Sequence, residues 1–179
     1  MFESIRKIFR KKRLARYSSD VQSGIIPLSA ISTVNVVIDV EEPGFETLKD
    51  NILAWGKQMG LKINIYFFDF RKLSKDELLL TSIQTTIIRK DLDWIGMPEP
   101  GKTGSLINEK SDLFISMVDN GDFPIEFISK CARARFKIGR YGFEGHAYDM
   151  IISGNPTDGL ASDSRKIFEA IKDFLNKIR

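Results

Sequence analysis

The stretch that most constrains the fold runs from residue 112 to residue 140 and has the pattern of strand, helix and strand. Residues 112–119 hold a nearly continuous apolar run that ends in an acid, which is typical of a strand buried on both faces of a parallel sheet. Residues 120–122 break this strand, and Pro124 then falls in the first turn of a helix, where its missing N–H costs nothing. A second strand follows over residues 134–139. The unit therefore predicts a right-handed βαβ crossover.

The rest of the chain alternates strands and helices in the same way. Strands are predicted over residues 34–40, 62–69, 83–90 and 148–153, and helices over residues 45–59 and 76–80 and from residue 163 onward. Residues 91–111 are predicted to form a loop with one helical turn near Leu106. This alternation predicts a single three-layer, Rossmann-like α/β domain, with a mostly parallel sheet of five or six strands in the order 3-2-1-4-5-6. The segment 148–153 would lie at one edge of the sheet, and the final helix would cover one face.

Positive charge is concentrated at the start of the chain. The first sixteen residues carry seven Lys or Arg against Glu3 alone, a charge of +6, so the remaining residues carry −3 of the net +3. Apolar residues recur among these cations at helical spacing, which predicts a basic amphipathic helix; they are Phe2, Ile5, Ile8 and Phe9. We therefore divide the chain into a basic helix and linker over residues 1–32 and an α/β domain over residues 33–179.

The sequence carries no signal of secretion or of membrane insertion. The basic start is not followed by the apolar core of a signal peptide, and no apolar run approaches the ~20 residues of a membrane span. The one cysteine, Cys131, excludes an internal disulfide framework and falls on the apolar face of the predicted central helix. We therefore expect a cytoplasmic protein in which Cys131 packs in the core.

Polar residues close several of the predicted strands. Asp39, Asp69 and Asp119 each end a strand, Asn120 follows the last of them, and Arg140 ends the strand after the central helix. In an open parallel sheet these ends share one edge, where ligands bind. The acids could hold a divalent ion and the arginine could bind a phosphate or carboxylate. Alternatively, the acids cap turns and Arg140 forms an ion pair with one of them. The five residues are the candidate ligand-binding set, and no metal ion or cofactor is assigned to them.

A second candidate is the segment 96–103, which matches the P-loop pattern G-x-x-x-x-G-K-T. Pro98 and Pro100 remove two of the N–H donors that such a loop needs. The residues between Thr103 and the next strand are also too few for the helix that usually follows. The segment is therefore predicted to be a surface loop in which Lys102 is not catalytic.

Several motifs resemble those of a known family. Residues 112–116, 134–139 and 148–152, with the Trp94-x-Gly96 turn and the basic start, resemble a family of uncharacterised Bacteroidetes proteins that carry a domain-of-unknown-function label. The resemblance covers most of the chain and implies a Rossmann-like fold without implying an activity. The central unit is also similar to the N-terminal Rossmann-like half of two-domain sugar transferases. Those enzymes need a second domain to bind the nucleotide sugar, and this chain has no room for one.

These patterns leave open whether the protein is an enzyme. The favoured interpretation is a non-catalytic binding or regulatory module. One alternative is a nucleotide or nucleotide-sugar binding enzyme, transferase-like, that uses the carboxyl edge of the sheet. Another is an adaptor that binds RNA or an anionic membrane through its polyanion-binding residues, which would be Arg6, Lys7, Arg10, Lys11, Lys12 and Arg13. The apolar stripe of the same helix could instead dock on the domain, or on a second copy in a homodimer.

Overall fold

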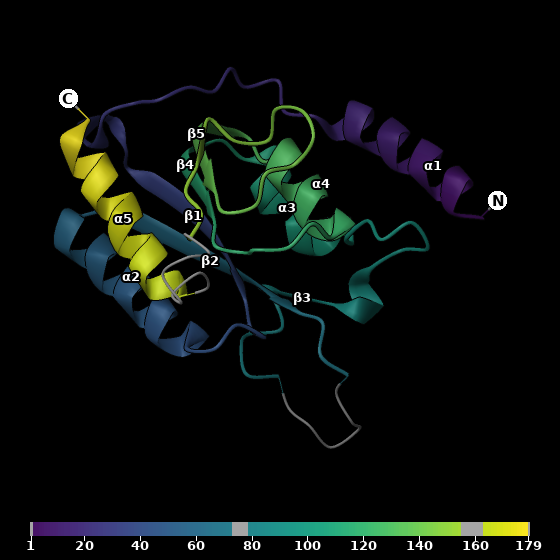
Figure 1. Cartoon of the computed structure of the whole chain (residues 1–179), viewed down its shortest axis with the longest axis horizontal. Coiled ribbons are helices and arrows are strands. Elements are labelled where there is room, and N and C mark those ends of the chain that lie inside the picture. The colour runs from purple at the N-terminus through teal and green to yellow at the C-terminus, as the bar shows by residue number, and fades with distance from the viewer. Residues whose placement is uncertain (1, 73–78, 155–162, 179) are drawn as a thin grey trace.

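A twisted parallel sheet forms the centre of the protein (Figure 1). The computed structural model describes residues 2–72, 79–154 and 163–178. Within them, the sheet has six strands in the order β3-β2-β1-β4-β5-β6, and every neighbouring pair is parallel. The strands are β1 (Thr33–Asp39), β2 (Lys62–Asp69), β3 (Thr86–Ile88), β4 (Ser111–Ser116), β5 (Ala134–Gly139) and β6 (Met150–Ile151). The predicted fold class and strand order are therefore confirmed.

The two central strands are buried on both faces. β1 pairs with β2 on one side and with β4 on the other, so that Val34 lies opposite both Ile63 and Leu113. Alternate side chains of β1 enter different cores: Val36 packs on one side of the sheet and Val37 on the other. A strand with two apolar faces needs a covering layer on each side, which explains the three-layer architecture.

Helices α2 (Phe45–Met59) and α5 (Ser164–Lys177) cover one face of the sheet (Figure 1). The apolar stripe of α2 packs on the sheet and on α5, where the ring of Trp55 meets that of Phe168 edge-on at 5.7 Å between centroids. α2 ends at Gly60, whose φ of 68° is a left-handed conformation that glycine adopts without strain. α5 begins after Asp163, whose carboxylate accepts a hydrogen bond from the Arg165 N–H at 3.1 Å.

Helices α3 (Pro100–Asn108) and α4 (Phe123–Cys131) cover the other face. α4 is the helix of the predicted βαβ unit, with Asp122 at the N-cap position and Pro124 in its first turn. Phe127, Ile128 and Cys131 are completely buried against the sheet, as expected from their spacing. Two 3-10 helices, η1 (Leu28–Ala30) and η2 (Arg89–Asp91), lie in the connections. The N-terminal helix α1 (Phe2–Tyr17) lies outside this layer, on the side of α4 (Figure 1).

Three elements differ from the prediction. The expected loop over 91–111 contains all of α3, because Pro100 starts a helix whose buried face, with Leu106 and Ile107, completes the core. β3 is shorter than 83–90, because only Thr86, Ile87 and Ile88 reach the edge of β2. β6 is likewise reduced from 148–153 to two residues, although it does lie at the sheet edge. The helix expected over 76–80 falls largely outside the described residues.

We predict that Phe127→Ala lowers the free energy of unfolding by ~3–5 kcal/mol, the usual cost of deleting a core aromatic ring. Phe127 has no exposed surface, and its ring contacts those of Tyr17 and Phe123. Urea unfolding measures the change, with Leu53→Ala on the exposed side of α2 as the matched control. Equal midpoints for Phe127→Ala and the unmodified chain would contradict this packing.

Candidate functional site

The carboxyl ends of β1, β4 and β5 surround a shallow hollow of about 220 Å³. It is lined by Asp39, Glu41, Glu42, Asp119, Asn120 and Arg140. Four of the five predicted ligand-binding residues therefore come together, as the parallel topology requires, and Asp69 does not join them. Within the described part of the chain, no three His, Cys, Asp or Glu side chains converge so that they could hold a metal ion.

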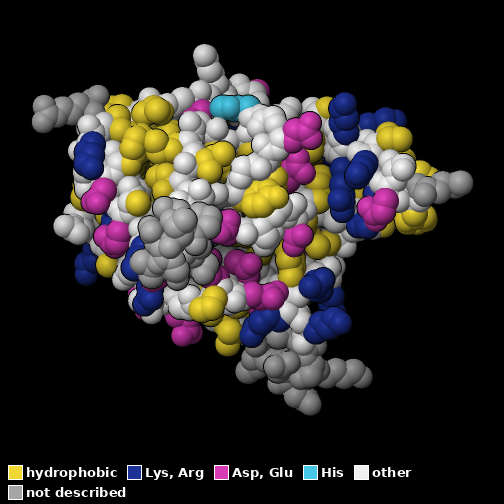
Figure 2. Space-filling model, viewed as in Figure 1, with side chains coloured by type: hydrophobic (Ala, Val, Ile, Leu, Met, Phe, Trp, Pro, Cys, Tyr) yellow, Lys and Arg dark blue, Asp and Glu magenta, His cyan; other side chains and the backbone are white. Residues whose placement is uncertain are grey.

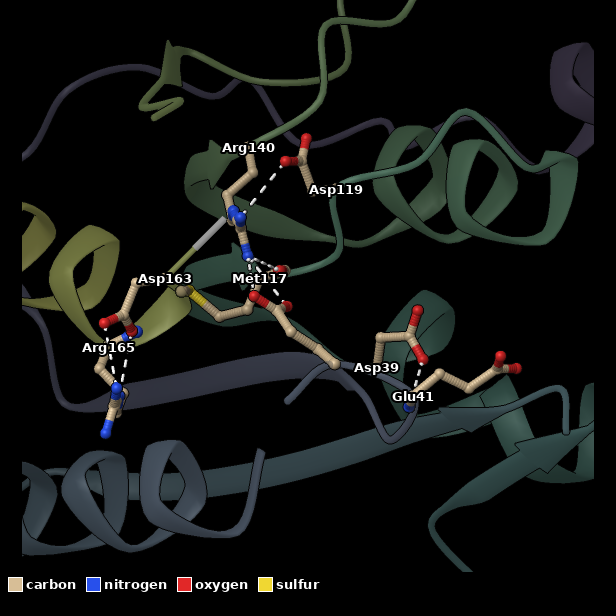
Figure 3. Close-up of polar contacts among 8 residues, drawn as sticks. Asp39, Glu41, Met117, Asp119, Arg140, Asp163 and Arg165 are labelled. Carbon is tan, nitrogen blue, oxygen red and sulfur yellow. Dashed lines mark hydrogen bonds and ion pairs between the residues drawn. The ribbon is translucent and has the colours of Figure 1, made fainter. Parts of the chain in front are cut away.

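Arg140 is the buried centre of this hollow. Its Nη1 donates to both carboxylate oxygens of Glu42, at 2.7 and 2.9 Å, and to the Met117 carbonyl at 3.0 Å. Its Nη2 donates to Asp119 at 3.3 Å, and Figure 3 shows the side chain reaching between these groups. The ion-pair interpretation of Arg140 is thus confirmed, and an incoming anion would have to displace Glu42 from a side chain with no exposed surface.

The remaining polar groups of the hollow also have local partners. The Asp39 carboxylate accepts the Glu41 N–H at 2.8 Å (Figure 3), and the Asn120 side chain accepts the Asp122 N–H at 3.1 Å. Burial raises the pKa of Asp39 above its ordinary value, and the charges of Glu41 and Glu42 add to this rise against the lowering effect of the Glu41 hydrogen bond. With four carboxylates against one guanidinium, the hollow repels phosphate-bearing ligands.

Asp69 lies at the end of β2, where Arg71 binds it with two hydrogen bonds of 2.8 and 2.7 Å. These bonds outweigh the effect of burial and lower the pKa of the Asp69 carboxyl. The Arg71 N–H donates to the same carboxylate at 3.3 Å. Asp69 therefore has the geometry of a turn cap, which was the alternative interpretation of the strand-end acids.

The segment 96–103 does not have the geometry of a phosphate-binding loop. Lys102 donates through its Nζ to the Asp91 carboxylate at 2.6 Å and to the Thr86 carbonyl at 2.8 Å. Thr103 is buried and donates to the Glu99 carbonyl. The prediction that no helix follows was wrong, because α3 begins at Pro100. However, the Lys102 side chain, which would contact a nucleotide phosphate in a P-loop, instead connects α3 to β3 and η2.

We predict that Lys102→Ala destabilises the fold by ~1–3 kcal/mol, because the half-buried Asp91 loses its partner. Thermal unfolding measures this change, and Lys57→Ala on the exposed face of α2 is the control. Equilibrium titration with ATP should show no micromolar binding to the unmodified chain. Tight ATP binding that Lys102→Ala removes would mean that the segment is a nucleotide site.

The N-terminal helix contacts the domain through one side. Arg10 donates to the Ile95 carbonyl at 2.7 Å, and its guanidinium lies 4.6 Å from the centre of the Phe123 ring. Tyr17 meets Phe127 edge-on at 5.8 Å, and Leu14 packs on the core beside α4. No residue of α1 is fully buried, so these contacts hold the helix at the surface of the domain.

The predicted apolar stripe of α1 lies largely away from these contacts. Phe2 is 74% exposed and Ile8 is 56% exposed, while Ile5 and Phe9 are each exposed by more than two fifths. Phe2 and Phe9 meet the exposed Trp94 of the domain edge-on, at 6.5 and 5.2 Å between ring centroids. Figure 2 shows Lys and Arg side chains gathered over this helix, with hydrophobic side chains beside them. The predicted docking of the apolar stripe on the domain is therefore seen for Phe2 and Phe9, whereas Ile5 and Ile8 are exposed.

The sequence analysis missed a buried cation, Lys137 of β5. It is 4% exposed and donates through its Nζ to the Ser129 and Lys130 carbonyls, at 3.1 and 3.2 Å, in the last turn of α4. A lysine at this place complements the unpaired carbonyls and the negative end of the helix. The sequence did hold a signal for this burial. Lys137 lies between Phe136 and Ile138 in a strand that is covered on both faces, so its side chain must also be buried.

Burial lowers the pKa of Lys137 from 10.5 to about 8. Between these two pH values the unfolded chain binds more protons than the folded chain at this residue, so its contribution to stability rises with pH. We predict that the stability of the unmodified chain, minus that of Lys137→Met, increases by up to about 3 kcal/mol from pH 7.5 to pH 10.5. Urea unfolding across this range tests it, and a difference that does not change with pH would contradict it.

The comparisons with known proteins identify a family of unknown function. The model of the family of unknown function DUF6913 matches residues 3–178. The chain therefore belongs to this family. No curated protein and no solved structure matches the sequence. Among the described residues, no helix is both long and apolar enough to cross a membrane.

Proposed function

We propose that this DUF6913 protein is a binding module that attaches to an anionic membrane surface through α1. The observation that carries the proposal is the exposure of apolar and basic side chains on the same side of one helix. Basic amphipathic helices lie in the membrane interface, with their apolar residues among the lipid chains and their cations near the anionic headgroups.

The apolar part of this surface consists of Phe2, Ile5, Ile8 and Phe9. The side of α1 that carries Arg10 and Leu14 is occupied by the domain, which leaves Ile5 and Ile8 facing outward. Trp94 extends the patch next to Phe9 and is 54% exposed. An indole that is partly apolar and partly polar suits the boundary between headgroups and lipid chains. Burial of these side chains in lipid would stabilise the attachment at ~25 cal/mol per Å² of apolar surface.

The cations beside this patch are available for headgroups. Lys12 and Arg13 form no ion pair within the described residues, and Arg16 is exposed. A basic residue near an anionic membrane contributes roughly 1 kcal/mol of attraction. The rest of the chain carries a net charge of −3, so attraction to an anionic surface comes from this helix.

Lipid is favoured over RNA by the apolar half of the surface. Contact with nucleic-acid phosphates needs the cations alone and would leave Ile5 and Ile8 in water. A transferase-like activity at the carboxyl edge of the sheet has less support, because the hollow there is acidic and Arg140 is already paired. A role as an interaction module agrees with both observations.

We predict that the full chain binds phosphatidylglycerol vesicles in a co-sedimentation assay, and that Ile5→Ser with Ile8→Ser weakens binding about tenfold or more, because two aliphatic side chains no longer enter lipid. The matched control is Ile25→Ser with Ile83→Ser, two exposed isoleucines outside α1. Binding should also weaken as salt rises and should be weaker on zwitterionic vesicles.

Two outcomes would overturn the proposal. One is equal vesicle binding by both double variants. The other is tight binding of single-stranded RNA, measured by fluorescence anisotropy, that exceeds vesicle binding and is unaffected by Ile5→Ser with Ile8→Ser. That result would assign the cations of α1 to nucleic-acid phosphates.

A further inference from the structure

A surface cavity of about 450 Å³, open to solvent, lies between α1, the segment that follows it and the end of α4. It adjoins a second hollow of about 600 Å³ beneath α1, with which it shares Lys11, Leu14, Lys130 and Gly145. Its volume falls in the range of ~300–1,000 Å³ that is common for small-molecule sites. The cavity is on the α4 side of the sheet and is separate from the acidic hollow at the strand ends.

The charged residues that line this cavity all have one sign. They are Lys11, Lys130 and Lys137, and no Asp or Glu lines the cavity, although Asp149 lies next to it, 3.4 Å from the lining residue His146. Hydroxyl groups come from the segment after α1, at Ser18, Ser19 and Ser23, of which Ser18 donates to the Ala15 carbonyl at 3.3 Å and Ser19 accepts the Val21 N–H at 3.1 Å. A concave site with several cations and hydroxyl groups suits an anion with many acceptor oxygens.

The partners of these groups show which of them are free to bind. Lys130 is engaged by Glu126 at 2.5 Å and by the Glu144 carbonyl at 2.7 Å, and Ser23 donates to Asp149 at 2.9 Å. Lys137 uses two of its three ammonium protons on the carbonyls of α4. Within the described residues, its third proton and the Lys11 ammonium have no acceptor.

We propose that this cavity binds the phosphate group of a small molecule, with Lys11 and Lys137 as its principal cations. Leu14, Ala15 and Val21 form an apolar wall on which the rest of the molecule packs. A phosphate offers more acceptors than a carboxylate and so matches the number of donors here better. The site does not depend on membrane attachment, because Lys11 and Lys137 are not part of the exposed apolar surface of α1.

The test is titration of the isotope-labelled full chain with inorganic phosphate at constant ionic strength, followed by nuclear magnetic resonance. We expect saturable shifts confined to the amides of residues 18–23, Lys137 and Gly145. Lys11→Glu and Lys137→Met should each weaken binding about tenfold or more, the effect of losing a charge-assisted hydrogen bond. Lys57→Glu, an equal charge change on the far side of the sheet, should bind phosphate like the unmodified chain.

Shifts that are not saturable, or affinities unchanged in Lys11→Glu, would overturn the proposal. If Lys137→Met does not fold, the exposed Lys11→Glu decides alone.

Repeating the titration with phosphatidylglycerol vesicles present identifies the source of the phosphate. Displacement of inorganic phosphate by vesicles assigns the site to a lipid headgroup, and undisturbed phosphate binding assigns it to a soluble metabolite; both results support the site. Vesicle binding lost by Ile5→Ser with Ile8→Ser, while phosphate binding is kept, separates this site from the membrane surface.

Discussion

The structure depends on the burial of both faces of β1 and β4. Val34, Val36, Val37 and Ile38 of β1 are almost completely inaccessible to solvent, as are the apolar residues of β4. Because neither face can be left in water, α2 and α5 must cover one side and α3 and α4 the other. The same parallel pairing brings the carboxyl ends of β1, β4 and β5 to one edge, so the position of the acidic hollow is a consequence of the core.

That edge is where open α/β sheets bind ligands, yet its polar groups are largely occupied by one another. Glu42 and Asp119 surround the buried guanidinium of Arg140, and Arg71 holds Asp69. Arg140 with its two carboxylate partners connects the ends of β1, β4 and β5, and removal of Glu42 would destabilise this junction because the buried guanidinium would lose its shorter ion pair. The exposed charges and the larger cavity lie instead around α1, which is why both proposals place binding there.

α1 differs from the other helices in the way it is held. The core helices bury apolar stripes, whereas α1 is attached by a hydrogen bond from Arg10, a cation–aromatic contact, three edge-on aromatic pairs and the packing of Leu14. Such contacts contribute roughly 1 kcal/mol each, much less than a buried stripe. The same placement leaves the helix with an exposed outer side and an inner side that lines the cavity, and each of the two proposals rests on one of these sides.

The sequence by itself determined the elements whose signals are local. The spacing of apolar residues and Gly60 predicted α2 residue for residue, the apolar runs located β1, β2 and β4, and their relative hydrophobicity predicted the strand order. Tertiary structure decided which polar groups meet. Arg140 pairs with Glu42, ninety-eight residues away, and Lys137 receives its neighbours only when α1 and α4 come together around it. Periodicity reports which face of an element is apolar, but the partner of a charge depends on the distance between side chains that only the packed chain brings together.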